Sequence, residues 1–278
     1  MVETRKVMTY NIMVEEHPPE LARLQRVVGI VRGEDPAVLG IQETRLTDGS
    51  ENYFLQALRG DFDYNRVLLE SDRQEGEELY GTGTTMMSKV QPRQAEAIIR
   101  GRAVQMVFAG SLGDLAIASV YFSHQSEAER VPQAREVVQE VKRHPYGLIM
   151  GDFNALSPED GITAKDFETF NPRMKQKYGN EDGTALYYGT VEAALNEGFV
   201  DIGLRFHTPA EMTGMTDVSH GTGQHLRPVR IDYVMVTPSL VKHIRDFQRI
   251  NNGQTRTASD HFPWTVDLDA SLFTKPSQ

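Results

Sequence analysis

Polar side chains able to bind a metal ion or a phosphate group recur at the ends of the expected strands. Asn11 and Glu43 end the first two apolar runs, and His124 ends a later one. Asp152 and Asn154 follow a fourth run, within the segment Gly-Asp-Phe-Asn. Layered α/β proteins bind ligands at strand ends, because a rigid sheet directs side chains from several segments to one point. These residue types suit a hard divalent cation or a phosphoryl group.

Asp232 is the most informative single residue. In the expected strand 231–236, alternation places it on the same face as Val234 and Val236, which is apolar. A carboxylate on such a face needs a partner, because an isolated buried charge is very costly. A histidine or a metal ion would serve. Arg230 or a nearby backbone amide would satisfy it in a purely structural role.

The tripeptide Ser259-Asp260-His261 is weak when taken alone, since an Asp beside a His is common by chance. A single residue such as His261 is more often a hydrogen-bonded structural histidine than a catalyst. Glu43 alone is compatible with a solvated loop or a helix cap. The Gly-Asp-Phe-Asn segment is equally compatible with a turn. Six such residues at strand ends, taken together, favour a catalytic site.

Apolar patterning predicts strands that alternate with helices, which is typical of a layered α/β domain. The segments 155–189 and 61–83 are expected to be irregular, and the second of them is acidic. We find no linker, repeat or low-complexity tract, so a single domain over 1–278 is expected. The expected strands are 7–12, 37–41, 115–121, 147–150, 231–236 and 264–268, and helical spacing marks 21–31, 134–141 and 191–195.

Composition narrows the classes of function. The chain has 278 residues and no cysteine, which excludes disulfides, thiolate nucleophiles and cysteine-ligated metal sites. The net charge is −10, from 39 acidic against 29 basic residues, and it argues against an extended surface for binding nucleic acid. No apolar stretch approaches the ~20 residues of a spanning helix, so no membrane insertion is expected. The N-terminus carries no export signal, so we expect a cytoplasmic protein unless such a signal was removed.

In their order, these motifs resemble the endonuclease/exonuclease/phosphatase superfamily, the phosphoesterases related to pancreatic deoxyribonuclease. The combination of Gly-Asp-Phe-Asn, Ser-Asp-His and an upstream Gln-Glu is specific, whereas each motif alone is not. Weaker similarity lies in Gly198–Asp201 and in the expected strand within 81–89. The matching segments are Thr9-Tyr10-Asn11-Ile12, Ile41-Gln42-Glu43, Ser123-His124, Gly151-Asp152-Phe153-Asn154, Arg230-Ile231-Asp232-Tyr233 and Ser259-Asp260-His261.

The resemblance implies a four-layer α/β/β/α sandwich, in which two mainly antiparallel or mixed β-sheets pack face to face. It also implies a divalent cation, Mg²⁺ with Mn²⁺ as the alternative. The reaction implied is hydrolysis of a phosphate ester by in-line attack of an activated water. The roles it implies are metal binding by Glu43 with Asn11 and Asp260, activation of water by Asp152, binding of a phosphoryl oxygen by Asn154, transition-state stabilisation by His261 with Asp232 as its orienting partner, and a further catalytic histidine at His124.

The substrate stays open between three hypotheses. The leading one is a small or locally recognised phosphate ester, because the acidic charge disfavours a long polyanion. A DNA-repair nuclease is the alternative, although the Asn-Ala-Gly segment of apurinic endonucleases is missing here. A catalytically inactive binding module is the third. Bases that would form a modest rim around the phosphate, if they are not ordinary solvated positions, are Arg227, Arg230, Lys242, Arg245, Arg249 and Arg256, with Arg93, Arg100 and Arg102 as a second cluster.

Overall fold

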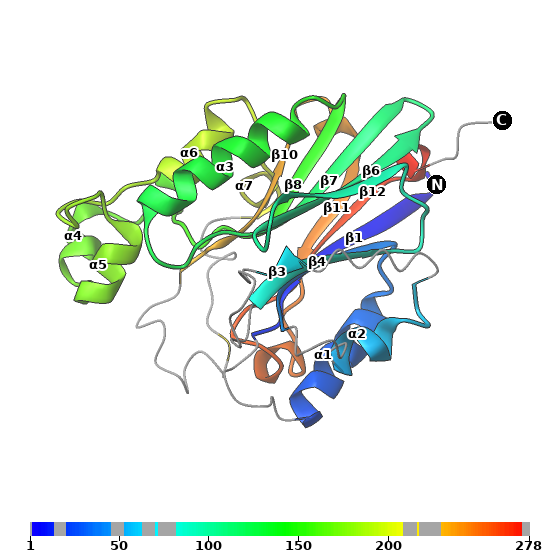
Figure 1. Cartoon of the computed structure of the whole chain (residues 1–278), viewed down its shortest axis with the longest axis horizontal. Coiled ribbons are helices and arrows are strands. Elements are labelled where there is room, and N and C mark those ends of the chain that lie inside the picture. The colour runs from blue at the N-terminus through cyan, green and yellow to red at the C-terminus, as the bar shows by residue number, and fades with distance from the viewer. Residues whose placement is uncertain are drawn as a thin grey trace.

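Two six-stranded β-sheets pack face to face, with helices on the outer face of each (Figure 1). This is the four-layer α/β/β/α sandwich that the motifs imply. Within the described ranges, no helix is both long and apolar enough to cross a bilayer. The computed structural model describes residues 2–13, 21–45, 53–62, 70–71, 82–207, 216 and 229–273.

The first sheet has the strand order β11-β12-β1-β2-β4-β3. Within it, β1 and β2 are parallel, and every other neighbouring pair is antiparallel. The parallel pair is joined by a helical crossover, as parallel neighbours require. The strands are β1 (Thr4–Asn11), β2 (Val38–Arg45), β3 (Glu70–Ser71), β4 (Thr82–Ser88), β11 (Ile244–Arg249) and β12 (Trp264–Asp269).

The second sheet has the order β5-β6-β7-β8-β10-β9 and repeats this plan. Only β7 and β8 are parallel, and they too are joined through a helix. Each sheet therefore has one parallel pair near its middle, whose carboxyl ends lie at the same edge. The strands are β5 (Gln94–Ile99), β6 (Ala103–Gly110), β7 (Gly113–Tyr121), β8 (Tyr146–Asp152), β9 (Val200–Asp201) and β10 (Asp232–Val236).

Helices cover the two outer faces, as Figure 1 shows. α1 and α2 pack on the first sheet over apolar residues such as Tyr10 and Ile41. α3 and α6 pack on the second sheet over residues such as Ala118 and Ile149. The helices are α1 (Leu21–Glu34), α2 (Tyr53–Leu58), α3 (Glu127–Val141), α4 (Ala164–Glu168), α5 (Pro172–Tyr178), α6 (Gly189–Leu195) and α7 (Ile202–Phe206), with 3-10 turns at Pro158–Asp160, Val241–His243, Thr255–Thr257 and Ala270–Phe273.

The largest apolar core lies between the sheets and confirms the expected alternation of β10. Val234 and Val236 join this inter-sheet core, whereas Tyr233 and Met235 pack on the helix side. Asp232 therefore does begin on the apolar, inter-sheet face. Its partner must come from the opposite sheet or from a loop above the two sheets.

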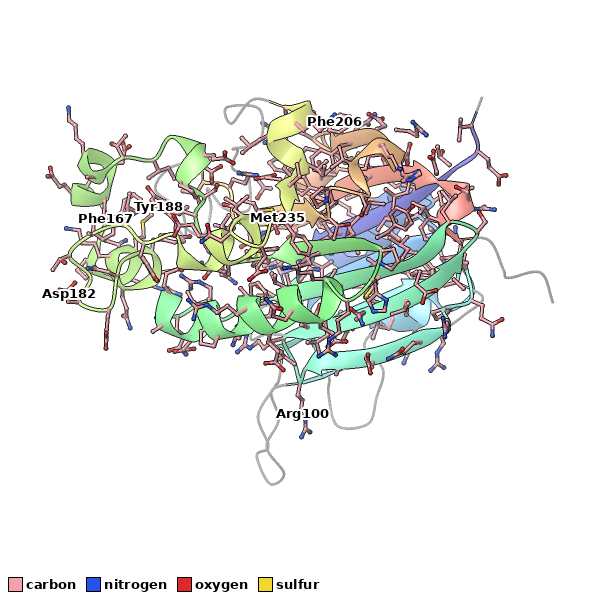
Figure 2. All side chains as sticks on the ribbon, turned by 90° about the horizontal axis from the view of Figure 1, so that it is seen from above. Arg100, Phe167, Asp182, Tyr188, Phe206 and Met235 are labelled. Carbon is pink, nitrogen blue, oxygen red and sulfur yellow. The ribbon has the colours of Figure 1, made fainter. Side chains whose placement is uncertain are left out.

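Residues 155–189 are helical over much of their length, which corrects the expectation of an irregular segment. That expectation rested on the mixture of Pro, Gly, Asn, Asp and Lys, and several of these residues instead begin helices. Asn171 Oδ1 accepts a hydrogen bond from the Met174 amide at 2.9 Å, with Pro172 in the first turn of α5. Thr163 and Asp166 form a capping box at α4. Figure 2 shows this segment at one end of the molecule, and most of the acidic stretch 61–83 lies outside the described residues.

Gly151 is required by the close approach of β7 and β8. Its φ is +134°, and a Cβ placed on it would lie 2.2 Å from the carbonyl oxygen of Val120, its neighbour on β7. No side chain can fit there without moving the strand that carries Asp152. Gly29 differs, because it is exposed in α1 and a Cβ there would meet nothing within 4 Å.

We predict opposite effects of alanine at these two glycines on the free energy of unfolding. Gly151→Ala should destabilise the protein by about 2 to 5 kcal/mol through backbone strain and overpacking. Gly29→Ala should stabilise it by about 0.5 to 1 kcal/mol, because glycine is unfavourable inside a helix. Urea denaturation of both variants measures this, and a neutral Gly151→Ala would contradict the proposed constraint.

Candidate active site

The two parallel pairs bring polar residues from both sheets together at one edge. Asn11 ends β1, and its amide donates to Glu43 Oε1 at 3.1 Å and to Asp152 Oδ2 at 3.0 Å. Glu43 belongs to the first sheet and Asp152 ends β8 in the second. The buried Asn11 amide thus joins carboxylates from opposite sheets.

A buried polar seam connects the sheets close to these residues. Gln42 Nε2 donates to Ser119 Oγ at 2.9 Å and to Thr9 Oγ1 at 3.1 Å. Thr84 Oγ1 lies 3.0 Å from the same Ser119 hydroxyl. Because buried polar groups need partners, these bonds fix how the two sheets sit relative to each other next to the site.

Glu43 is turned into the site by an irregularity in β2. The register with β4 shifts between Gln42 and Thr44, and Glu43 has φ +60°. Burial raises the pKa of Glu43 from near 4.5 to about 7, and the charge of Asp260 adds to this. Tyr121, at the end of β7, shares a side-chain hydrogen bond with Glu43. A cation beside this carboxylate would stabilise its charged form and so offset the cost of its lost hydration.

Asp152 and Asn154 form a tight turn in which each orients the other. The Asn154 amide N–H donates to Asp152 Oδ1 at 2.7 Å, and Asn154 has φ +51°. Its side-chain Nδ2 donates to Asp152 Oδ2 at 3.2 Å and to the Phe122 carbonyl at 3.0 Å. Burial raises the pKa of Asp152, although the charge of His261 opposes the shift.

His261 is the partner of Asp232, which settles the question that the apolar face posed. Its Nδ1 lies 2.7 Å from Asp232 Oδ2, and Asp232 pairs in register with Asp152 on β8. Burial favours the neutral ring, but the charges of Asp232, Asp260 and Asp152 outweigh it and raise the pKa of His261 well above its usual value.

The segment that carries His261 is fixed to the end of β1. Ser259 Oγ donates to the Asn11 carbonyl at 2.7 Å and accepts the His261 amide N–H at 3.2 Å. His261 Nε2 then lies 3.9 Å from both Asp152 Oδ2 and Asp260 Oδ1. The ring is 8% exposed, so a protonated Nε2 faces the carboxylates from a largely dry position.

Seven of the eight predicted residues therefore converge, and His124 differs. It follows β7 on an exposed loop, and no hydrogen bond or ion pair joins it to a residue in the described ranges. Its pKa is lowered, first by lost hydration and then by the charges of Lys177, Arg102 and Arg173. His124 lies beside the site in a positive field.

Sequence patterns missed Lys177 and Tyr121. Lys177, on α5, donates from Nζ to Asn154 Oδ1 at 2.6 Å. Burial lowers its pKa to about 8, and the charges of Arg130 and Arg173 add to this while Asp152 opposes it. No local sequence signal marks Lys177, because the composition of its segment predicts a loop. Tyr121 was visible only as the apolar end of a strand.

The expected basic rim fails for at least three of its members. One is Arg93, which pairs with Asp114 at 3.0 Å, at the end of β7 that lies away from the site. Arg230 is buried and bonds Asp160 Oδ1 at 2.8 Å through Nε and Asp201 Oδ2 at 2.6 Å through Nη1. Arg245 bonds Asp269 Oδ1 at 2.5 Å, on the opposite edge of the sheet. Arg230 thus satisfies two buried acids instead of Asp232 or a substrate, and Arg227 lies outside the described residues.

The donor set fits a hard cation. Glu43, Asp152 and Asp260 offer carboxylate oxygens to a metal, and Asn11 offers only Oδ1, which also accepts the Met13 N–H at 3.0 Å. In the described part of the chain, no group of three or more His, Cys, Asp or Glu side chains forms a ready-made cage. Oxygen donors of this kind suit a hard divalent cation. The raised pKa of the partly buried Glu43 is the observation that favours an added positive charge.

A family model described as the Endonuclease/Exonuclease/phosphatase family matches residues 8–261. The chain belongs to this family. The match spans every residue of the cluster and confirms the resemblance seen in the motifs. A comparison with curated proteins finds no matching sequence.

Solved structures share the fold at low sequence identity. A 3′ phosphatase, NExo, from Neisseria, bound to a product DNA hairpin, has a TM-score of 0.64 and 18% identity. An AP endonuclease from Archaeoglobus fulgidus has a TM-score of 0.66 and 16% identity. The 3′-5′ exonuclease NExo from Neisseria meningitidis has a TM-score of 0.63 and 18% identity. Each comparison covers 95% of this chain and 99% of the other, so the fold is shared over nearly its full length.

We predict that Glu43→Gln stabilises the metal-free protein. Because the folded state holds an extra proton on Glu43 between pH 4.5 and about 7, stability falls as pH rises through that window. In EDTA at pH 8, the variant should therefore gain on the order of 1 to 2 kcal/mol. Mg²⁺ should raise the Tm of the wild type but not that of the variant. Equal Tm gains with Mg²⁺ in both proteins would contradict metal binding at Glu43.

Asp232→Asn should lower the pKa of His261 in metal-free protein, since an adjacent carboxylate favours the charged ring. The raised pKa gives stability that is present below pH 6.5 and lost as pH rises through the folded-state value. The variant should lose that contribution. An NMR titration of the imidazole measures the shift, with Asp267→Asn, remote on β12, as control. An unchanged titration curve for His261 would show that the Asp232 carboxylate does not stabilise the charged imidazole.

Proposed function

We propose that the protein is a divalent-metal-dependent hydrolase that cleaves a phosphate ester by in-line attack of an activated water. One observation carries the proposal. Asn11 holds Glu43 and Asp152 together, and His261, bonded to Asp232, faces Asp152 from 3.9 Å. Oxygen donors for a cation, a base and a cationic acid thus share one small volume. Family membership supports hydrolysis of phosphoester bonds.

Glu43, Asn11 and Asp260 would hold the metal. The ion would supply Lewis-acid stabilisation of charge on the phosphoryl oxygens. The buried position of Glu43 and its contact with Tyr121 favour a fixed carboxylate. With these three residues assigned to the metal, Asp152 remains available for proton transfer.

Asp152 would accept the proton of the attacking water. Its two oxygens are oriented by hydrogen bonds from Asn11 and Asn154, so the carboxylate cannot rotate freely. Its raised pKa brings it closer to the range in which a base is effective at neutral pH. A carboxylate fixed in this way would hold the attacking water in line with the phosphorus atom.

His261 and Asn154 would bind the phosphoryl group. The ring of His261 is held on Asp232 and presents Nε2 toward the site, where an imidazolium stabilises oxygen charge. Asn154 Nδ2 already donates to Asp152 Oδ2 and to the Phe122 carbonyl. A phosphoryl oxygen would therefore take the place of the Asp152 oxygen at this donor. His124 would contact the substrate from the exposed rim.

Two substrate classes follow. The net charge of −10 favours a small or locally recognised phosphate ester. Nuclease activity is the second candidate, because structural neighbours include a 3′ phosphatase bound to a DNA hairpin and an AP endonuclease. An inactive binding module is disfavoured, because seven of the eight predicted residues converge.

Hydrolysis of bis-p-nitrophenyl phosphate tests the proposal. Activity should require Mg²⁺ or Mn²⁺ and disappear in EDTA. Glu43→Ala and His261→Ala should each lower kcat by about 10² to 10⁴-fold, as expected when acid–base or electrostatic groups are lost. Asp114→Asn is the matched control, because this carboxylate pairs with Arg93 at the other end of β7. Equal rates in EDTA, or no loss in both variants, would refute the mechanism.

Comparing an abasic-site DNA duplex with small phosphodiesters separates the two substrate classes. If the small-ester hypothesis holds, kcat/KM should be higher for the small ester, and added salt should change it little. A nuclease should instead prefer DNA and lose activity steeply with salt. The salt dependence of kcat/KM is the deciding measurement.

A further inference from the structure

The segment between β8 and α6 places cationic side chains on one side of the site. It folds around an apolar cluster that includes Leu156, Phe167 and Tyr178, and it lies at one end of the molecule, where Phe167 is labelled in Figure 2. α5 belongs to this segment and carries Arg173 and Lys177 one helical turn apart, on the same face. The apolar cluster gives these bases a fixed platform.

Arg130, on α3, holds the two stretches of backbone that carry Lys177 and His124. Its guanidinium donates to the Lys177 carbonyl and, at 2.9 Å, to the Ser123 carbonyl just before His124. Arg130 is fully buried, and Glu127 neutralises it at 2.8 Å. Glu127 Oε2 in turn accepts from the Thr190 hydroxyl at 2.8 Å. Lys177 and His124 are therefore positioned by one internal network.

Within the described residues, no salt bridge joins Lys177, Arg173 or His124 to an acidic side chain. Arg173 is exposed, and neither it nor His124 has a hydrogen bond or ion pair within the part of the chain that the structure describes. Lys177 Nζ contacts a neutral oxygen, that of Asn154. Lost hydration is the main cause of the lowered pKa values of His124 and Lys177, and the charge of Arg173 adds to both shifts, whereas that of Asp152 opposes them. Like charges held together favour binding of an anion.

We propose that Lys177, Arg173 and His124 form a subsite for a second phosphate group of the substrate. It lies next to the reacting phosphate, because Lys177 contacts Asn154, and Arg173 stands about 5.4 Å further along the helix. The assignment of the reacting phosphate rests on the proposed function. The substrate class is then an ester with two neighbouring phosphates, either a terminal monoester beside the reacting group or a diester in a strand.

The subsite can be measured by binding, without turnover. Isothermal titration calorimetry in Mg²⁺ would compare thymidine 5′-monophosphate with thymidine 3′,5′-bisphosphate and with a 5′-phosphorylated thymidine dinucleotide. The protein would carry Asp152→Asn to suppress hydrolysis. At least one two-phosphate ligand should bind on the order of 10-fold or more tightly than the monophosphate, as charge-assisted hydrogen bonds allow. Whichever ligand binds more tightly identifies the source of the second phosphate.

Variants on α5 decide whether these residues are responsible. Lys177→Gln combined with Arg173→Gln should reduce the preference to about 3-fold or less, whereas Lys177→Arg should keep most of it. Lys175→Gln removes one charge from the same helix and is the matched control, since its ammonium lies over the Phe167 ring. Circular dichroism would check that α5 remains folded.

The subsite is refuted if the protein with Lys177 and Arg173 unsubstituted shows no preference for two-phosphate ligands. It is also refuted if the double variant keeps that preference. This result is independent of the hydrolysis assay. A preference that depends on Lys177 and Arg173, in a protein that does not hydrolyse bis-p-nitrophenyl phosphate, supports the subsite and counts against the proposed reaction. Hydrolysis without that preference supports the reaction and overturns the subsite.

Discussion

The two hydrogen bonds that Asn11 donates hold the candidate site together. They place Glu43 of one sheet and Asp152 of the other against one amide group, although both carry negative charge at neutral pH in water. The polar seam of Gln42 and Ser119 fixes the two sheets near this point, and Ser259 fixes the loop of His261 to the Asn11 backbone. A small change in the packing of the sheets would therefore separate the reacting groups.

Without a bound cation and anion, the close charges of this arrangement would be electrostatically unfavourable, and this favours binding of both. Burial raises the pKa values of Glu43 and Asp152, while neighbouring acids raise that of His261. A bound cation would therefore stabilise the charged carboxylates, and a bound anion would stabilise the imidazolium. A metal ion and a phosphate group together satisfy both needs. The stability lost in the free protein becomes binding free energy for the complex.

Sequence reasoning succeeded where chemistry and strand period coincide. Asn11, Glu43, Asp152 and Asp232 sit on strands or at their ends, so spacing alone places them at one edge, and the apolar face of β10 demanded a partner for Asp232. Lys177 could not be found this way. Its position depends on caps such as Asn171, on a local apolar cluster and on Arg130, forty-seven positions away in sequence. The hairpin of β5 and β6 also escaped, because its apolar residues lack a clear boundary.

The distribution of cations explains how a chain with a net charge of −10 can still bind an anionic group locally. Arg23, Arg130 and Arg230 are buried, and each guanidinium serves backbone carbonyls or paired carboxylates inside the fold. Arginine suits that role, because it stays charged and donates in several directions. Such charges are neutralised within the protein and contribute little field outside it. A substrate meets instead the few cations next to Asn154, so the local balance at the site can be positive on a chain whose total is −10.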